Sequence, residues 1–135
     1  MAEFPDPKER SVFFDNKKLY ACLAFHPVVE GHTIVVWKTD VEDLNDLSFS
    51  NYQYFMETVY RTRKALLSFF KTDKVYLAYL DEARHVHMHL LPRKKDSQIK
   101  GFQLMIQPQK EIADLMNKAR LLDTIYSLHK LMMKE

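Results

Sequence analysis

An α+β fold is predicted from three features of the sequence. Five short segments are rich in β-branched, aromatic and aliphatic residues, and mostly short connections between them favour antiparallel pairing. Two longer segments carry apolar residues at helical spacing. The 135 residues are 47% hydrophobic and 28% charged, a balance that supports a buried core. We therefore expect a single domain over residues 1–135.

The expected strands lie at residues 18–26, 32–38, 74–80, 85–92 and 101–107. Pro27 should end the first of them, because proline removes a hydrogen-bond donor from the ladder. Residues 28–31 then form a turn into the second strand. Residues 39–49 are acidic and are expected to form a loop with room for a short helical turn.

Two helices are expected. The first covers residues 50–71, where Ser50 and Gln53 match a capping box. Its apolar positions recur at spacings of three and four and define one buried face: Tyr52, Phe55, Met56, Val59, Leu66 and Phe70. The second covers about 108–132, with Pro108 in the first turn, where a missing N–H costs nothing.

Composition excludes several classes of function. A net charge of +2 provides no electrostatic case for nucleic acid or a membrane surface. Only Gly31 and Gly101 are glycines, which excludes glycine-rich phosphate loops. The single cysteine, Cys22, excludes an internal disulfide and cysteine-based zinc motifs, and it is expected to be buried and inert. With no long apolar run, we expect a cytoplasmic protein with neither nucleic-acid nor membrane partners.

Three histidines, His85, His87 and His89, alternate along one expected strand. Alternate residues of a strand project from the same face, about 7 Å apart at Cα, so the three imidazoles should line up on one side. The intervening Val86 and Met88, together with Leu90, should point into the core.

Three readings of this row compete. A His-x-His pair can bind a metal, but the outer rings are about 13 Å apart at Cα, so a further ligand would have to come from Asp81, Glu82 or His32. Alternatively, the neutral ring of His87 can attack phosphorus while the flanking rings bind phosphate oxygens. The third reading is a histidine-rich binding surface without catalysis.

The residues also resemble a known family. HVHMHLL, residues 85–91, matches the signature of the histidine triad (HIT) superfamily, and PVVEGHTIVV, residues 27–36, is similar to its Gly-His segment and places a fourth histidine at His32. HLLPRKK, residues 89–95, resembles the fragile-histidine-triad branch and its bacterial hydrolase relatives. The similar region covers residues 10–107.

The resemblance implies a five-stranded antiparallel sheet with one long central helix and a C-terminal helix, usually as a homodimer. It implies a hydrolase or nucleotidyl transferase that acts on dinucleoside polyphosphates or adenylyl conjugates and releases AMP-like products. By position, His87 would be the nucleophile that forms a nucleotidyl-histidine. His85 and His89 would contact phosphate or orient the nucleophile, and His32 would support the cluster.

The resemblance also implies a substrate pocket, with Leu23, Phe25 and Ile34 as lining candidates beside the nucleoside, His26 near the position of the family's ribose-binding residue, and Arg84 near phosphate. Trp37 is a further lining candidate, but from the residues alone core packing is the preferred interpretation of both Phe25 and Trp37. No metal ligands and no required cofactor are expected, although magnesium can accompany a polyphosphate substrate. The approach to the triad, LDEAR at residues 80–84, favours one alternative, a nucleotide-binding sensor with weak catalysis. A histidine-ligated metalloprotein remains the other.

Overall fold

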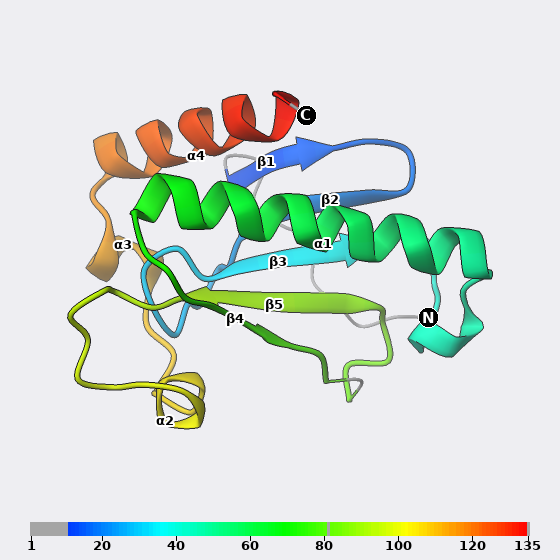
Figure 1. The fold of residues 1–135 in the computed structure, drawn as a ribbon, viewed down its shortest axis with the longest axis horizontal. Coiled ribbons are helices and arrows are strands. Elements are labelled where there is room, and N and C mark those ends of the chain that lie inside the picture. The colour runs from blue at the N-terminus through cyan, green and yellow to red at the C-terminus, as the bar shows by residue number, and fades with distance from the viewer. Residues whose placement is uncertain (1–10, 81, 135) are drawn as a thin grey trace.

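The computed structural model describes residues 11–80 and 82–134. Its sheet contains β1 (Val12–Asp15), β2 (Leu19–Leu23), β3 (Thr33–Trp37), β4 (Val75–Ala78) and β5 (His87–Pro92). The five strands are antiparallel in the order β1-β2-β3-β5-β4, as Figure 1 shows. The helices are α1 (Phe49–Phe70), α2 (Phe102–Met105), α3 (Ile112–Leu115) and α4 (Lys118–Met133), with a 3₁₀ turn at Leu44–Asp46. The predicted α+β class and five-stranded antiparallel sheet are therefore confirmed.

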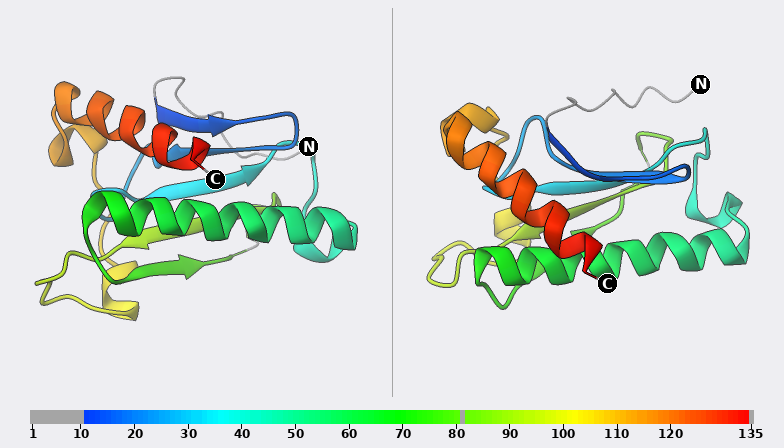
Figure 2. Two further views of the ribbon diagram at one scale, coloured as in Figure 1. Left: turned by 45° about the horizontal axis from the view of Figure 1, so that its top comes forward. Right: turned by 90° about the horizontal axis from the view of Figure 1, so that it is seen from above.

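The core lies between the sheet and two helices. α1 and α4 both pack on one face of the sheet, as the two views of Figure 2 show. Trp37 of β3 meets Phe55 of α1 edge to face, with ring centroids 6.4 Å apart, and both side chains are buried. Trp37 is thus part of the core rather than of a ligand pocket.

Strand register assigns each side chain to a face of the sheet. Leu23 pairs with Thr33, which pairs with Leu90, and this row faces α1. The neighbouring row faces away from α1 and runs from β2 to β4 through Cys22, Ile34, His89 and Ala78. The histidines therefore lie on the face opposite the long helix.

Two strand predictions are wrong. Residues 101–107 contain the short helix α2 instead of a fifth strand, and the fifth strand is β1, in the stretch before Asn16. Gly101 has φ +58 and donates its N–H to the Tyr76 hydroxyl at 2.8 Å, so the chain turns at this point. The first and third expected strands are also shorter than predicted, ending at Leu23 and Ala78.

The predicted helix starts also need correction. α1 begins at Phe49, because Ser48 is the N-cap and its hydroxyl accepts the Asn51 N–H at 3.1 Å. The C-terminal helix does not start at Pro108. Instead, the Lys110 backbone N–H donates to the Pro27 carbonyl oxygen at 2.7 Å and holds this segment against the turn at residues 27–31.

α4 consequently starts ten residues later than predicted, at Lys118, after the single turn of α3. Its N-cap is Asn117, whose side-chain oxygen accepts the Arg120 N–H at 2.8 Å. Among the described residues, no helix combines the length and apolar character needed to cross a membrane.

Candidate functional site

The histidine row lies at the start of β5. His87 and His89 are in the strand, and His85 lies just before it. His85 and His87 are buried, and His89 is partly exposed. Val86, Met88 and Leu90 are buried on the opposite side, as the period-two pattern predicts.

A tight turn brings His32 to this row from another part of the chain. Gly31 has φ +88, and a Cβ there would lie 2.6 Å from the Phe70 ring, so only glycine fits the turn. His32 Nε2 lies 2.9 Å from His89 Nδ1. The ring centroids of His89 and His87 are 4.9 Å apart. His32, His87 and His89 thus lie in one cluster, and the His85 carbonyl oxygen contacts the His87 ring.

The hydrogen bond of His87 defines its tautomer. Its Nδ1 lies 2.6 Å from the His85 carbonyl oxygen, which can only accept, so Nδ1 carries the proton. In the neutral ring, Nε2 then has a lone pair. His85 itself is held by a hydrogen bond from Nε2 to the Trp37 carbonyl, and its Nδ1 lies 3.8 Å from the Asp40 carboxylate. A competent nitrogen nucleophile therefore sits at the centre of the row.

A second chain of hydrogen bonds orients His89. The Val28 backbone N–H donates to His32 Nδ1 at 3.0 Å, so the neutral His32 carries its proton on Nε2. That N–H donates to His89 Nδ1, which leaves the proton of a neutral His89 on its Nε2. His89 is thereby arranged as a hydrogen-bond donor suited to a phosphate oxygen.

Burial keeps these rings neutral. Desolvation, with repulsion from His89 as a smaller cause, lowers the pKa of His32 to about 3. Desolvation and then His87 lower the pKa of His89 to about 4. The pKa of His87 is also lowered, mainly by burial, although its bond to the His85 carbonyl acts in the opposite direction. Near pH 7 the tautomers deduced above are therefore the relevant ones.

A cavity of about 530 Å³ opens beside His89 and His32. Its wall is formed by the end of β4, by β5 and by α2. The other described lining residues are Val28, Leu77, Ala78, Tyr79, Leu80, Leu91, Phe102, Met105, Ile106 and Gln109. The cavity is thus mostly apolar, with the imidazoles at one side.

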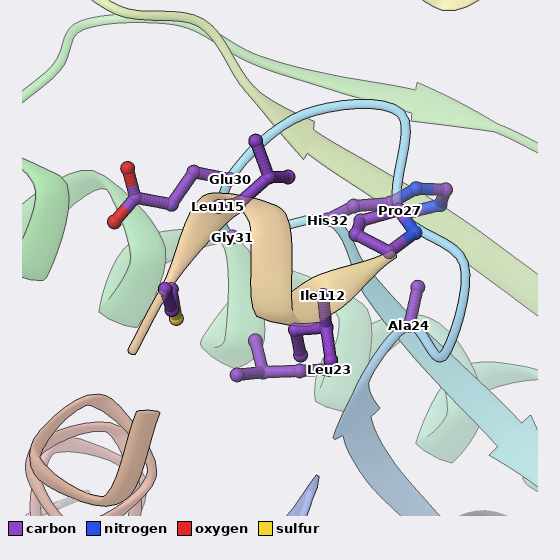
Figure 3. Close-up of a pocket in the computed structure, with 9 residues that line it drawn as sticks. Leu23, Ala24, Pro27, Glu30, Gly31, His32, Ile112 and Leu115 are labelled. Carbon is purple, nitrogen blue, oxygen red and sulfur yellow. The ribbon is translucent and has the colours of Figure 1, made fainter. Parts of the chain in front are cut away.

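Of the residues expected to bind substrate, Ile34 lies on the same face of the sheet as His89. It pairs with His89 across β3 and β5 and is partly exposed on the same face. Leu23 faces α1 and is buried, and it lines a small pocket together with Gly31, His32 and Ile112 of α3 (Figure 3). The structure therefore brings Ile34, but not the Leu23 side chain, to the histidine face.

Phe25 and His26 follow β2 and lie beside the start of α3. Their rings stack at 4.6 Å, and His26 Nδ1 lies 3.2 Å from the Glu111 carboxylate. Phe25 lines a separate cavity of about 310 Å³ beside α3 and α4. Arg84 is exposed in the bend before His85, with φ 55. None of these three side chains lines the cavity beside His89.

Several residues at the site were missed by sequence reasoning. Cys22 shares a row with Ile34 and His89, and strict alternation along β2 could have identified it in place of Leu23. Its thiol is buried, as predicted, and burial raises its pKa to about 12. No local signal pointed to Val28, which contributes a backbone N–H, or to α2.

A metal-binding arrangement is not apparent at the cluster. His32 Nε2 and His89 Nδ1 are hydrogen-bonded to each other, so these atoms do not converge on an ion in this arrangement. Across residues 11–80 and 82–134, no group of three or more His, Cys, Asp or Glu side chains is placed to hold one.

Comparison with known proteins points to one family. The HIT domain family matches residues 7–96. A bis(5'-adenosyl)-triphosphatase of Saccharomyces cerevisiae is 30% identical over 91 residues, covering 62% of this chain and 44% of the relative. One from Dictyostelium discoideum is 27% identical over 94 residues, covering 65% of this chain and 63% of that protein.

Structural comparison supports the fold. A hypothetical histidine triad nucleotide-binding protein from Sulfolobus tokodaii superposes with a TM-score of 0.71 at 20% identity, covering 92% of this chain and 84% of that one. The chain spans about half the length of the yeast relative, 44%.

Proposed function

The chain belongs to the HIT domain family, and from that premise we propose that it is a nucleotide hydrolase or nucleotidyl transferase. It cleaves dinucleoside polyphosphates or adenylyl conjugates at the α-phosphate through a nucleotidyl-histidine on His87. The names of the yeast and Dictyostelium relatives support this class of substrate. The observation that carries the proposal is the bond between His87 Nδ1 and the His85 carbonyl, which directs the ring's lone pair to Nε2.

In the first step, His87 Nε2 attacks the α-phosphorus and forms a P–N bond. The bond from phosphorus to the leaving group breaks, and its electron pair departs with the leaving group. The positive charge that develops on the ring is stabilised by the Nδ1–H···O=C bond to His85. His89 Nε2–H donates to a phosphate oxygen, and the Val28–His32 chain holds it in that tautomer.

In the second step, water attacks the same phosphorus. The P–N bond breaks, its electron pair returns to His87 Nε2, and AMP leaves while the water proton passes to solvent. The protein supplies positioning and hydrogen bonds in both steps, and no protein-bound cofactor is required in the proposal. Magnesium takes part only as a companion of a polyphosphate substrate.

We also propose that the protein is a homodimer assembled through α1 and the β4 edge of the sheet. Tyr60 on α1 is 65% exposed, and β4 is an edge strand with an open ladder. Sedimentation at micromolar concentration measures this assembly. A cytoplasmic location is consistent with one buried, reduced thiol.

The test is release of AMP from a substrate panel by the intact chain and by two variants. The panel contains diadenosine tri- and tetraphosphate, adenosine phosphoramidate and AMP-lysine. His87→Asn should abolish turnover while the chain stays folded, and His129→Asn, in which a histidine far from the cluster is changed, should retain it. Labelled AMP should be trapped on the intact chain in alkaline detergent, because a P–N bond is labile in acid.

The outcomes separate the two candidate functions. Full activity of a folded His87→Asn variant would contradict the mechanism. Binding of AMP without release of AMP from any panel member would select the nucleotide-binding sensor. That alternative is favoured by the exposed bend before the triad, where Arg84 and Glu82 are both solvent-exposed.

A further inference from the structure

We propose that the cavity between β4, β5 and α2 is a leaving-group subsite that selects adenylyl conjugates with an uncharged, apolar leaving group. This inference rests on the proposed function, because it requires attack by His87 on the α-phosphorus. It adds a preference that neither the family nor the named relatives specify. The preference comes from where the cavity lies and from what lines it.

The position of the cavity follows from the order of residues on β5. His87, His89 and Leu91 follow one another on the same face of the strand, and the last two line the cavity. The ring of His89 lies beside that of His87, with ring centroids 4.9 Å apart, and His89 lines the cavity. A leaving group on the His89 side of a phosphorus bound at His87 would therefore lie next to the cavity.

The chemistry of the lining argues against a charged occupant. None of the described lining residues is Asp, Glu, Lys or Arg. The outer wall includes exposed apolar side chains of the α2 segment: Ile106 is 56% and Phe102 72% exposed. A polyphosphate tail would find no Lys or Arg side chain among the described lining residues to pair with, whereas an aryl or alkyl group would bury these apolar surfaces.

The outer wall is held against the sheet. The Tyr76 hydroxyl on β4 accepts the Gly101 N–H at the start of α2 and is also approached by Arg93 Nη1 at 3.4 Å. α2 lies beside the β4 end of the sheet in Figure 1. Phe102 and Ile106 thus face the cavity from a fixed segment.

The inference is tested with AMP esters of 4-alkylphenols, from 4-methyl to 4-butyl. The His87 attack breaks the P–O bond to the aryl oxygen, and the phenolate departs with the electron pair and takes a proton from water. The alkyl chain hardly changes the acidity of the phenol, so reactivity stays constant while apolar area grows. All esters form the same AMP–His87 intermediate, so differences in kcat/KM report the first step alone.

The expected result is a rise in kcat/KM of about two- to fourfold for each added CH₂. Phe102→Ala should flatten this gradient, whereas Tyr126→Ala on α4, a ring 63% exposed in the intact chain, should not. Ile106→Lys should also flatten it and should raise kcat/KM for diadenosine triphosphate by up to about fivefold through a new exposed ion pair. Leu122→Lys, on α4, is its matched control.

Calorimetry on folded His87→Asn separates failure of the subsite from failure of the proposed function. Turnover of every ester with no dependence on chain length, or gradients that Phe102→Ala leaves unchanged, would overturn the subsite. Tighter binding of longer esters without turnover by the intact chain would retain the subsite and overturn the proposed function. If the intact chain turns over none of the esters and the affinity does not depend on chain length, both the subsite and the proposed function are overturned.

Discussion

Lowering the pH from 7 to 5 should reduce the free energy of unfolding by about 3–4 kcal/mol through two buried histidines. The pKa of His32 is lowered to about 3 and that of His89 to about 4, from an ordinary 6.5. Between these values and 6.5, the unfolded chain binds protons that the folded chain does not. Stability therefore rises with pH in this window and is lost as the pH falls.

The magnitude follows from proton linkage. A histidine with a pKa of about 6.5 in the unfolded chain and about 4 or below in the folded chain lowers the free energy of unfolding by about 2 kcal/mol between pH 7 and pH 5. At pH 5 His32 and His89 are both still neutral in the folded chain, so their repulsion does not enter the sum. Most carboxylates remain ionised above pH 5, so this window isolates the histidines.

Urea denaturation at pH 7, 6 and 5 measures the effect. The intact chain should show a falling transition midpoint at nearly constant slope. His32→Gln removes one titrating ring and should lose about 2 kcal/mol of the pH-dependent change, whereas His26→Gln, on the surface, should keep the whole change. Equal free energies of unfolding at pH 7 and pH 5, or the same loss in His32→Gln, would refute the deduction that these rings are buried and neutral.

Two further predictions concern the local structure that supports the site. Ser48→Ala should lower the free energy of unfolding by about 1 kcal/mol, because Ser48 caps α1, and Ser50→Ala should change it by less than half of that in the same urea assay. Gly31→Ala should lower the free energy of unfolding by about 2–3 kcal/mol, because Gly31 has φ +88 and the new Cβ would lie 2.6 Å from the Phe70 ring. Gly101→Ala meets no atom within 4 Å, so thermal melting should show a smaller loss from backbone strain alone; an equal loss would show that the Phe70 contact does not matter.

Short-range patterns were sufficient to predict which side chains of β5 lie on the histidine face of the sheet and which face the core. Alternation alone places His87 and His89 on one side and Met88 and Leu90 on the other, because the side-chain period of a strand is two residues. The same rule, applied to β2, predicts that Cys22 rather than Leu23 lies on the histidine face of the sheet. The helical spacing of apolar residues likewise predicted the two long helices, α1 and α4, but not the short helix α2. The N-cap of α1 was predicted at Ser50, whereas the structure has it at Ser48, because both serines are suitable caps.

The sequence by itself determined which residue types occupy the site and that the imidazoles of His87 and His89 share one face, since both depend on neighbours within a few residues. The tautomer of His87 is set locally, by the His85 carbonyl just before the strand. Only the tertiary structure decided the tautomer of His89, because it is set by His32, which lies 57 positions away. α2 likewise replaced an expected strand because Gly101 bonds to Tyr76, a contact between distant segments that no local propensity encodes.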